Sequence, residues 1–361
     1  MRIIFDGHLD LSWNALSWGR DITLDLDELN RGERAMTDHP ARGRATTTLP
    51  EMRRGAIAVC QATLLARARP EGRPHDGPSR LNLDFANQEI ASATARGQLA
   101  YYELLSRRGL LRMIRAATEL DAHMQSWSAE PDSTPIGYIL AMEGADPIVD
   151  VGHAATWWEL GLRSVNLAHY GKSRYAVGTG GDGPLTPDGV RLLKEFERLG
   201  MILDATHLSD TSFFQALDTF GGPVLASHNN CRELVPDGRQ FSDEQIRRLI
   251  ERDAVIGAAL DAWMLVPGWI RGQTARDVVG LDAVADHIDR ICQLAGNAHH
   301  AAIGSDLDGG FGTEQTPIGL DRISDLQKLD AILTGRGYPP EAIDAIFHGN
   351  WLRFFREHLP R

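Results

Sequence analysis

The chain has 361 residues and 43% of them are hydrophobic, so it is long enough to bury a sizeable core. It carries 37 Lys and Arg against 49 Asp and Glu, and this net charge of −12 argues against nucleic acid or an anionic membrane surface as a partner. Because Cys60, Cys231 and Cys292 are far apart and odd in number, we interpret them as small buried side chains rather than a disulfide framework.

The beginning of the sequence and its apolar runs bear on location. Residues 1–10 (MRIIFDGHLD) pass directly into a strand-like pattern, so we expect no signal peptide. No apolar run reaches the ~20 residues that a membrane-spanning helix requires. We therefore expect a soluble, cytoplasmic protein without a membrane partner.

Short runs rich in Val, Ile, Leu and Ala recur along the chain, each bounded by Gly, Pro or polar residues. Most runs are continuous rather than alternating, which is typical of strands covered on both faces. Eight runs are predicted as buried strands: 2–9, 55–66, 136–142, 162–168, 200–206, 223–227, 254–260 and 300–305.

Longer segments with helical spacing separate these strands. Start signals support two of them, because Thr186 precedes Pro187 and Ser242 is followed three residues later by Gln245. The predicted helices cover residues 81–107, 110–126, 154–160, 187–199, 210–220, 243–252 and 282–295. Strand and helix alternate throughout, and eight repeats favour a closed (β/α)8 barrel of the TIM type, with an open doubly wound sheet as the alternative.

The remaining segments fit a single barrel domain over residues 1–361. Residues 17–50 and 66–80 are polar, and we interpret them as loop insertions after strands 1 and 2, over the mouth of the barrel. Residues 341–359 predict a terminal amphipathic helix with a Gly-Asn interruption. No linker or low-complexity tract divides the chain.

Nearly every predicted strand is followed by a side chain that can bind a metal or exchange a proton. In a (β/α)8 barrel the carboxyl ends of the strands face the active site, so these side chains are expected to converge on one cavity. The residues are His8, Asp10, Glu143, His169, His207, His228 and Asp306.

Spacing adds weight to two of these positions. His8 and Asp10 are two residues apart on a strand, so their side chains point to the same face and could bind one ion. Asp306 and Asp308 also share a face in the run AAIGSDLDGG. We favour Asp306, the residue nearer the strand, as the functional one and interpret Asp308 as a loop hydrogen-bonding residue.

The donor set consists of imidazoles and carboxylates without a thiolate. Such a set suits Zn²⁺, with Mn²⁺, Co²⁺ or Fe²⁺ as alternatives. It is too rich in histidine for Ca²⁺ or Mg²⁺.

Several motifs together resemble the membrane dipeptidase (renal dipeptidase) family, peptidase family M19, within the amidohydrolase superfamily. Their order and spacing carry the resemblance, which spans almost the whole chain. The motifs are FDGHLD, LPEMRRGAIAV, AMEGAD, LGMILDATHLSD, ASHNNCRELVPDGRQFSDEQI, IGSDLDGG and GNWLRFFRE.

The resemblance implies a zinc-dependent dipeptidase with two metal ions in a TIM-like barrel. His8 and Asp10 would hold one zinc and His207 and His228 the other, with Glu143 as the bridge. Asp306 would handle the proton of the attacking water. The resemblance further implies that His169 steadies the oxyanion and that Arg239 binds the substrate carboxylate. The resemblance also extends the expected substrates to dipeptides with a C-terminal D-residue. It implies a homodimer as the assembly.

One segment departs from the family pattern. Tyr170, Lys172, Arg174 and Tyr175 lie beside His169, where the family is usually rich in Asn. They could alter the substrate pocket or bind an anionic group, with Tyr170 as the candidate for substrate contact. This departure keeps open a metal-dependent amidohydrolase that acts on another small amide, a lactam or an N-acyl amino acid.

Two further classes are weaker alternatives. A metal-binding scaffold without catalysis would not need the full set of residues found here. A barrel phosphoesterase would need more phosphate-binding donors, and the sequence contains no phosphate loop.

Overall fold

The computed structural model describes residues 1–69 and 83–361, and it contains all eight predicted strands in chain order. Each strand lies inside its predicted range, and all of them are buried. They are β1 (Ile4–Leu9), β2 (Ile57–Leu64), β6 (Ile136–Met142), β7 (Leu162–Asn166), β8 (Ile202–Asp204), β9 (Val224–Leu225), β10 (Ile256–Ala258) and β11 (Ala301–Ile303).

These strands pair in parallel and follow one another around a barrel. Six of them form the ladder β1-β2-β6-β7-β8-β9, and β10 pairs with β11. A parallel bridge between Ala226 and Ile256 joins β9 to β10. On the other side, the amide of Asp306 donates to the carbonyl of His8 at 3.3 Å. The fold is therefore the expected (β/α)8 TIM-like barrel, and the open doubly wound sheet is excluded.

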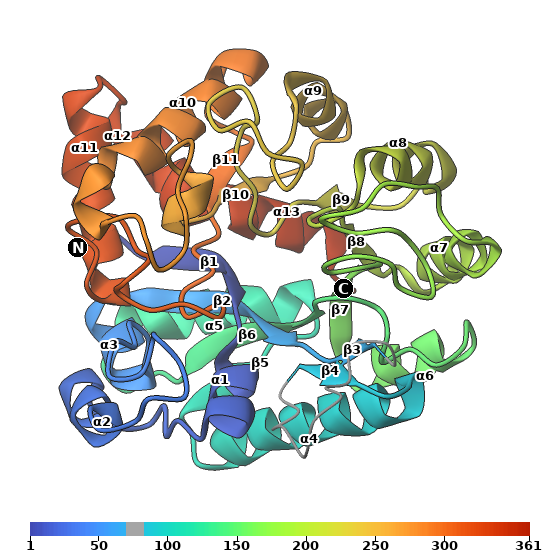
Figure 1. The fold of residues 1–361 in the computed structure, drawn as a ribbon, viewed down its shortest axis with the longest axis horizontal. Coiled ribbons are helices and arrows are strands. Elements are labelled where there is room, and N and C mark those ends of the chain that lie inside the picture. The colour runs from blue at the N-terminus through green and yellow to red at the C-terminus, as the bar shows by residue number, and fades with distance from the viewer. Residues whose placement is uncertain (70–82) are drawn as a thin grey trace.

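Helices connect the strands and surround them, as Figure 1 shows for α4, α7, α8, α9, α10 and α11. The helices that follow the first strands are α1 (Leu11–Trp18), α2 (Leu26–Glu33), α3 (Leu49–Arg54), α4 (Gln88–Arg107), α5 (Ala117–Ala129) and α6 (His153–Glu159). The later ones are α7 (Pro187–Leu199), α8 (Asp210–Thr219), α9 (Asp243–Glu251), α10 (Asp282–Ala295), α11 (Leu329–Gly335), α12 (Pro340–Asp344) and α13 (Asn350–His358).

Both predicted helix start signals are confirmed. The Thr186 side chain accepts a hydrogen bond from the amide of Gly189 at 3.0 Å, which caps α7. Ser242 and Gln245 form a reciprocal capping box at the start of α9. Each cap satisfies backbone donors that a helix leaves unpaired in its first turn.

The predicted helix at 110–126 is wrong in its first part. Residues Leu111–Met113 form a short strand, β5, which pairs in parallel with the beginning of β6. The helix α5 begins only at Ala117. A short apolar run fits a strand and a helix equally well, and here the first residues of β6, which β7 leaves unpaired, decide in favour of the strand.

The predicted helix at 81–107 begins later than expected. Residues 81 and 82 lie outside the described residues, and α4 begins after Asn87, whose side chain accepts from the amide of Ile90 at 2.9 Å. This cap stops the helix from extending toward the preceding strand β4 (Asp84–Phe85).

The two predicted insertions contain more structure than loops. Within 17–50, α2 packs Leu26 and Leu29 against Ala45. Within 66–80, residues Arg67–Ala68 form β3, which pairs in parallel with β4. The prediction for residues 70–80 lies outside the described residues.

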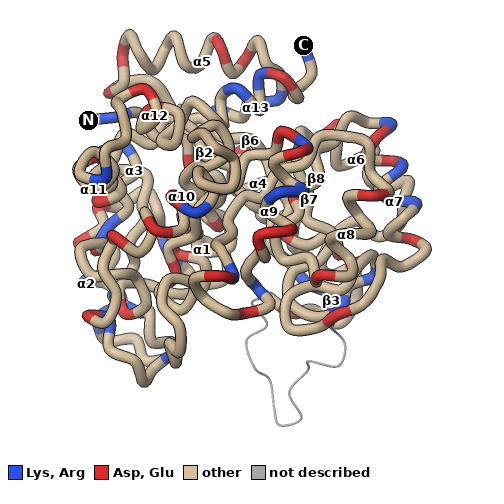
Figure 2. Tube along the Cα trace, turned by 90° about the horizontal axis from the view of Figure 1, so that it is seen from above, with Lys and Arg blue, Asp and Glu red and all other residues tan. Residues whose placement is uncertain are grey.

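The chain ends in the predicted amphipathic helix, in three parts. Between α12 and α13, residues Ala345–Gly349 form a π-helical turn at the predicted interruption. Phe355 of α13 stacks on Phe5 of β1 with ring centroids 5.3 Å apart, and Trp351 donates to the carbonyl of Ile303 at 2.9 Å. Figure 2 shows α13 and α5 together at one end of the molecule, with β3 at the opposite end.

Charged residues of both signs interleave along the outer helices in Figure 2. Across residues 1–69 and 83–361, the helices are all too short or too polar to cross a membrane.

Candidate active site

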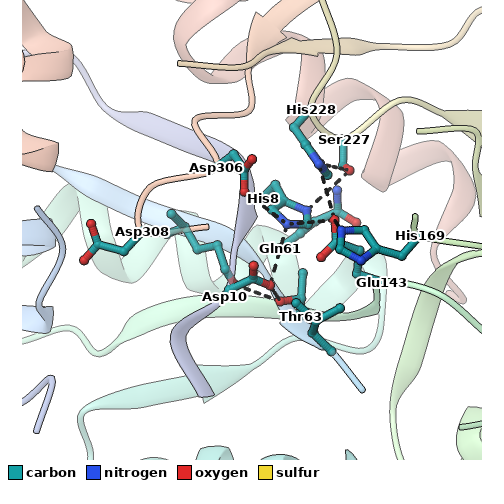
Figure 3. A network of polar contacts seen from close by, with 12 residues as sticks. His8, Asp10, Gln61, Thr63, Glu143, His169, Ser227, His228, Asp306 and Asp308 are labelled. Carbon is teal, nitrogen blue, oxygen red and sulfur yellow. Dashed lines mark hydrogen bonds and ion pairs between the residues drawn. The ribbon is translucent and has the colours of Figure 1, made fainter. Parts of the chain in front are cut away.

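The seven side chains that follow the strands converge at one end of the barrel, as Figure 3 shows for six of them. All lie at or just beyond the carboxyl end of a strand, which is where a (β/α)8 barrel places its active site. They are His8 near the end of β1, Asp10 just after β1, Glu143 after β6, His169 after β7, His207 after β8, His228 after β9 and Asp306 after β11.

Two of these residues have an unusual backbone. His207 has φ +69° and Asp306 has φ +59°, in the left-handed region that side chains other than glycine rarely adopt. Such conformations persist only where the surrounding structure holds them, and they concentrate at functional sites. Here they turn the chain sharply after β8 and β11, so that both side chains point back to the barrel axis.

The first group of possible metal ligands surrounds His8. Its Nε2 lies 3.7 Å from Oδ1 of Asp10 and 3.7 Å from Oε1 of Glu143. The hydroxyl of Thr63 donates to Asp10 and fixes the orientation of that carboxylate. In the described part of the chain, His8 Nε2 is buried and has no hydrogen-bond partner.

The second group also contains Glu143 and adds His207 and His228. Oε1 of Glu143 is 3.0 Å from Nε2 of His207 and 3.4 Å from Nε2 of His228, and these two nitrogens are 3.2 Å apart. The opposite ring nitrogens contact hydroxyls, Nδ1 of His207 at 2.9 Å from Thr179 and Nδ1 of His228 at 3.0 Å from Ser227. Each hydroxyl orients an imidazole so that its Nε2 faces Glu143.

Burial governs the titration of the carboxylates. It raises the pKa of Glu143 to about 8, with Asp10 adding to the rise. It also raises the pKa of Asp306 well above the ordinary value. Burial alone would lower the pKa of His8, but Glu143 and Asp10 outweigh it and raise that pKa to about 10. The carboxylates therefore repel one another in a buried space, and a divalent cation between them would relieve the repulsion.

The other three histidines are held neutral. Burial lowers the pKa of His169, His207 and His228 well below the ordinary value, and positive charges nearby, including Arg239, add to the effect. A neutral imidazole keeps a lone pair on one ring nitrogen, which is the form that binds a metal.

The arrangement fits two divalent metal ions. Within residues 1–69 and 83–361, three sets of side chains have ligand atoms that all lie within 4.8 Å of one another: His8, Asp10 and Glu143; Glu143, His207 and His228; His8, His228 and Asp306. The first two sets share Glu143, which has two oxygens and can bridge two ions. The unpartnered Nε2 of His8 and the close approach of two neutral imidazole nitrogens are explained if each nitrogen binds a cation.

The structure separates the two aspartates after β11. Oδ1 of Asp306 lies 3.8 Å from Nε2 of His8, inside the cluster. Asp308 points away from it (Figure 3) and accepts from the amide of Thr46 at 2.9 Å and from Arg20 at 3.4 Å. The interpretation of Asp308 as a loop hydrogen-bonding residue agrees with these contacts.

The remaining predicted site residues line the same cavity, which has a volume of about 720 Å³. Nε2 of His169 lies 3.7 Å from Oε1 of Glu143. The ring of Tyr170 contacts the ring of His169 edge-on, with centroids 4.8 Å apart. Arg239 is 2% exposed, and its guanidinium donates to Asn229 and, at 2.8 Å, to the carbonyl of His228.

The rest of the 170–175 segment lies elsewhere. Arg174 pairs with Asp188 at 3.0 Å on the outside of the molecule. Tyr175 is fully buried, and its hydroxyl donates to the carbonyl of Ile148. Of the four departures from the family pattern, Tyr170 lines the cavity and Lys172, Arg174 and Tyr175 do not.

Sequence reasoning missed several residues of this cavity. Trp13, Trp263 and Trp269 supply aromatic walls, and Asp261 and Arg67 supply charges. Trp263 and Asp261 follow the seventh barrel strand, so their position after β10 is a signal that could have found them. Arg67 follows the second barrel strand, β2, so the same signal applies to it, although its segment was interpreted as a loop.

A (β/α)8 barrel with histidines and carboxylates gathered at the carboxyl ends of its strands is an arrangement typical of metal-dependent hydrolases. The family model for membrane dipeptidases, peptidase family M19, matches residues 1–359. The chain belongs to this family.

The sequence identities to individual relatives are low. The dipeptidase tcpJ of Claviceps purpurea is 28% identical over 231 residues, which are 61% of this chain and about half (51%) of that protein. The solved structure of the dipeptidase AC, a metallopeptidase of family M19, has a TM-score of 0.78 at 23% identity, over 100% of this chain and 99% of that one. A metallopeptidase of Rhodobacter sphaeroides, liganded with a phosphinate mimic of L-Ala-D-Ala, has a TM-score of 0.77 at 23% identity, over 99% of this chain and 100% of that one.

Proposed function

We propose that the protein is a zinc-dependent dipeptidase that hydrolyses the peptide bond of dipeptides, including those with a C-terminal D-residue. The observation that carries this proposal is Glu143, which two of the three ligand sets share and which lines a cavity together with Arg239. Family membership supports the reaction, and the dipeptide mimic held by the Rhodobacter sphaeroides relative supports the substrate class.

Two zinc ions would be held on either side of Glu143, by His8 and Asp10 on one side and by His207 and His228 on the other. Bound divalent cations lower the pKa of water toward ~7 and polarise a carbonyl group, which supplies a nucleophile and an electrophile at neutral pH. Mn²⁺, Co²⁺ and Fe²⁺ accept the same donors, so metal analysis of the purified protein tests the choice of zinc.

Asp306 is the residue we assign to proton transfer. Its side chain is 16% exposed, compared with 3% for both Asp10 and Glu143, so it is the carboxylate of the cluster most open to the cavity. It would accept the proton of the attacking water and return it to the peptide nitrogen, which then leaves as a neutral amine.

His169 and Arg239 act on the substrate itself. Nε2 of His169 faces the cluster and would donate to the carbonyl oxygen as negative charge develops on it. The guanidinium of Arg239 is held in place by two acceptors, while its buried Nε has no partner in the described part of the chain. A fixed guanidinium can pair with the terminal carboxylate of a dipeptide through two parallel hydrogen bonds.

The test is a hydrolysis panel on protein refilled with zinc after chelation. It contains L,L and L,D dipeptides, the same dipeptides amidated at the C-terminus, and N-acyl amino acids. We expect turnover of free dipeptides and about two zinc ions per chain. Turnover of the N-acyl amino acids alone, or a single ion at saturating zinc, would sink the proposal as stated.

Three properties stay predictions. Limited proteolysis would test whether the chain forms a single domain. Cell fractionation would test the cytoplasmic location, and sedimentation velocity would test the homodimer. The roles of the site residues are tested by the variants described below.

A further inference from the structure

Arg67 contacts the ring of His169 on the side that faces away from Glu143. Its Nη1 lies 3.2 Å from Nδ1 of His169. Its Nε and Nη2 donate to the two carboxylate oxygens of Asp84 at 2.7 and 2.8 Å. Arg67 and Asp84 are register partners in the pair β3–β4, and the Arg67 side chain is 13% exposed. Asp84 therefore fixes the guanidinium, which points at Nδ1 of His169.

This contact determines which nitrogen of His169 carries the proton. A guanidinium has only donors, so Nδ1 of His169 must be the acceptor with the lone pair. In a neutral imidazole the hydrogen then lies on Nε2, the nitrogen 3.7 Å from Oε1 of Glu143. His169 therefore presents a donor to the cavity.

The two neighbouring histidines have the opposite arrangement available to them. Their Nδ1 atoms contact the hydroxyls of Thr179 and Ser227, which can accept a hydrogen. A hydrogen on Nδ1 leaves the lone pair on Nε2 of His207 and His228, as a metal ligand requires. The group that contacts Nδ1 thus decides what Nε2 of each histidine can do. In His207 and His228 it leaves Nε2 free to bind a metal, and in His169 it makes Nε2 a hydrogen-bond donor.

We propose that Arg67 is a positioning residue that locks His169 in the Nε2–H tautomer, so that it donates to the substrate oxygen and does not bind metal. The use of that donor in amide hydrolysis rests on the function proposed above. The tautomer itself does not, because it follows from the contact between Arg67 and Nδ1.

The test compares Arg67→Met and Arg67→Lys with Arg69→Met in zinc-loaded protein. Arg69 is the matched control, because it lies two residues further along and carries the same charge, but the structure gives it no hydrogen bond to His169. We expect Arg67→Met to lower kcat on the order of tenfold, as loss of a residue that orients an active-site histidine does. Arg67→Lys keeps a charged donor and should recover part of that loss, while Arg69→Met stays near wild type.

The second readout is the ¹⁵N spectrum of histidine-labelled protein, with the His169 signals assigned from His169→Gln. We expect an unprotonated Nδ1 and a protonated Nε2 in the wild type and in Arg69→Met. In Arg67→Met the His169 signals should move toward a mixture of tautomers at unchanged zinc content.

Two results would overturn the inference. One is a protonated Nδ1 at His169 in the wild type. The other is an unchanged His169 spectrum in Arg67→Met. If that variant also raised only KM, Arg67 would contact the substrate directly rather than position His169. A wild type that hydrolyses no dipeptide overturns the proposed function instead, because the spectrum still reports the tautomer.

Discussion

Asp306 and Asp308 show how two identical side chains, two residues apart, take different tasks. Asp306 lies in the cluster of candidate metal ligands on a left-handed backbone, while Asp308 ties the 46–47 segment to the barrel through Thr46 and Thr47. The sequence predicted this division from distance to the strand end alone. It could not give the reason, which is that the turn after β11 sends the two carboxylates in different directions.

The two asparagine variants should therefore fail differently. Asp306→Asn removes the proposed proton acceptor, and we expect kcat to fall by about 10²–10⁴-fold while zinc content and thermal midpoint stay near wild type. Asp308→Asn weakens a buried hydrogen-bond network, and we expect a loss of about 1–3 kcal/mol in unfolding free energy with kcat largely kept. Kinetics, metal analysis and denaturant unfolding of both variants measure this, and equal loss of zinc in both would contradict the assignment.

Arg239 makes a separate prediction about substrate recognition. Arg239→Met removes the proposed partner of the terminal carboxylate, so KM for dipeptides should rise at least about tenfold, as for loss of one charge-assisted pair. Amidated dipeptides offer the matched control, because they lack the carboxylate and should respond little to the variant. An unchanged KM for free dipeptides would show that Arg239 does not bind the carboxylate.

Six of the eight barrel strands deliver the seven predicted side chains to the cavity at their carboxyl ends, and this repetition is why the site could be predicted so far. Parallel strands have their carboxyl ends at one edge, and continuous apolar runs mark those strands clearly. The partners behind the ligands could not be predicted in this way. Thr179, Ser227 and Arg67 come from different parts of the chain, and which hydroxyl or guanidinium meets which ring depends on how those parts pack.

The outer helices carry buried polar groups of their own, and His287 of α10 makes the stability of the protein depend on pH. His287 is 1% exposed, and its Nδ1 accepts from the amide of Cys231 at 3.0 Å. Burial lowers the pKa of His287 to about 4, against 6.5 in the unfolded chain. Above pH 6.5 both states are neutral, and below it the unfolded chain takes up a proton that the folded protein does not.

The contribution of His287 to stability is therefore complete above pH 6.5 and is lost as pH falls toward 4. The loss amounts to about 3 kcal/mol, at 1.36 kcal/mol for each pKa unit. Denaturant unfolding of the wild type and of His287→Gln at several pH values measures it, because other groups cancel in the difference. The wild type should lose its advantage over the variant between pH 6.5 and 4.5, and a constant difference would contradict the prediction.

At the scale of the whole molecule, the sequence predicted the barrel, the order of its strands, the insertions over its mouth and the terminal helix, but not how these added segments pack. Continuous apolar runs specify buried strands regardless of what lies beyond them. The pairing of β3 with β4 and the packing of α13 under Phe5 are long-range contacts. They bring together residues whose own patterns carry no sign of the partner.

Metal removal should affect the stability of the whole barrel, because the ligands come from strands that are distant in the sequence. A group that binds only the folded state stabilises it by about 2.7 kcal/mol at a concentration 100 times its Kd. We therefore expect chelation to lower the thermal midpoint, and zinc to restore it. In Glu143→Gln the neutral amide weakens both ion sites at once, so zinc should raise its midpoint much less. Asp308→Asn is the control, since it lowers the midpoint without touching the ligands and should keep the full response to zinc. If Glu143→Gln responded to zinc as fully as the wild type, the bridging role of Glu143 would have to be abandoned.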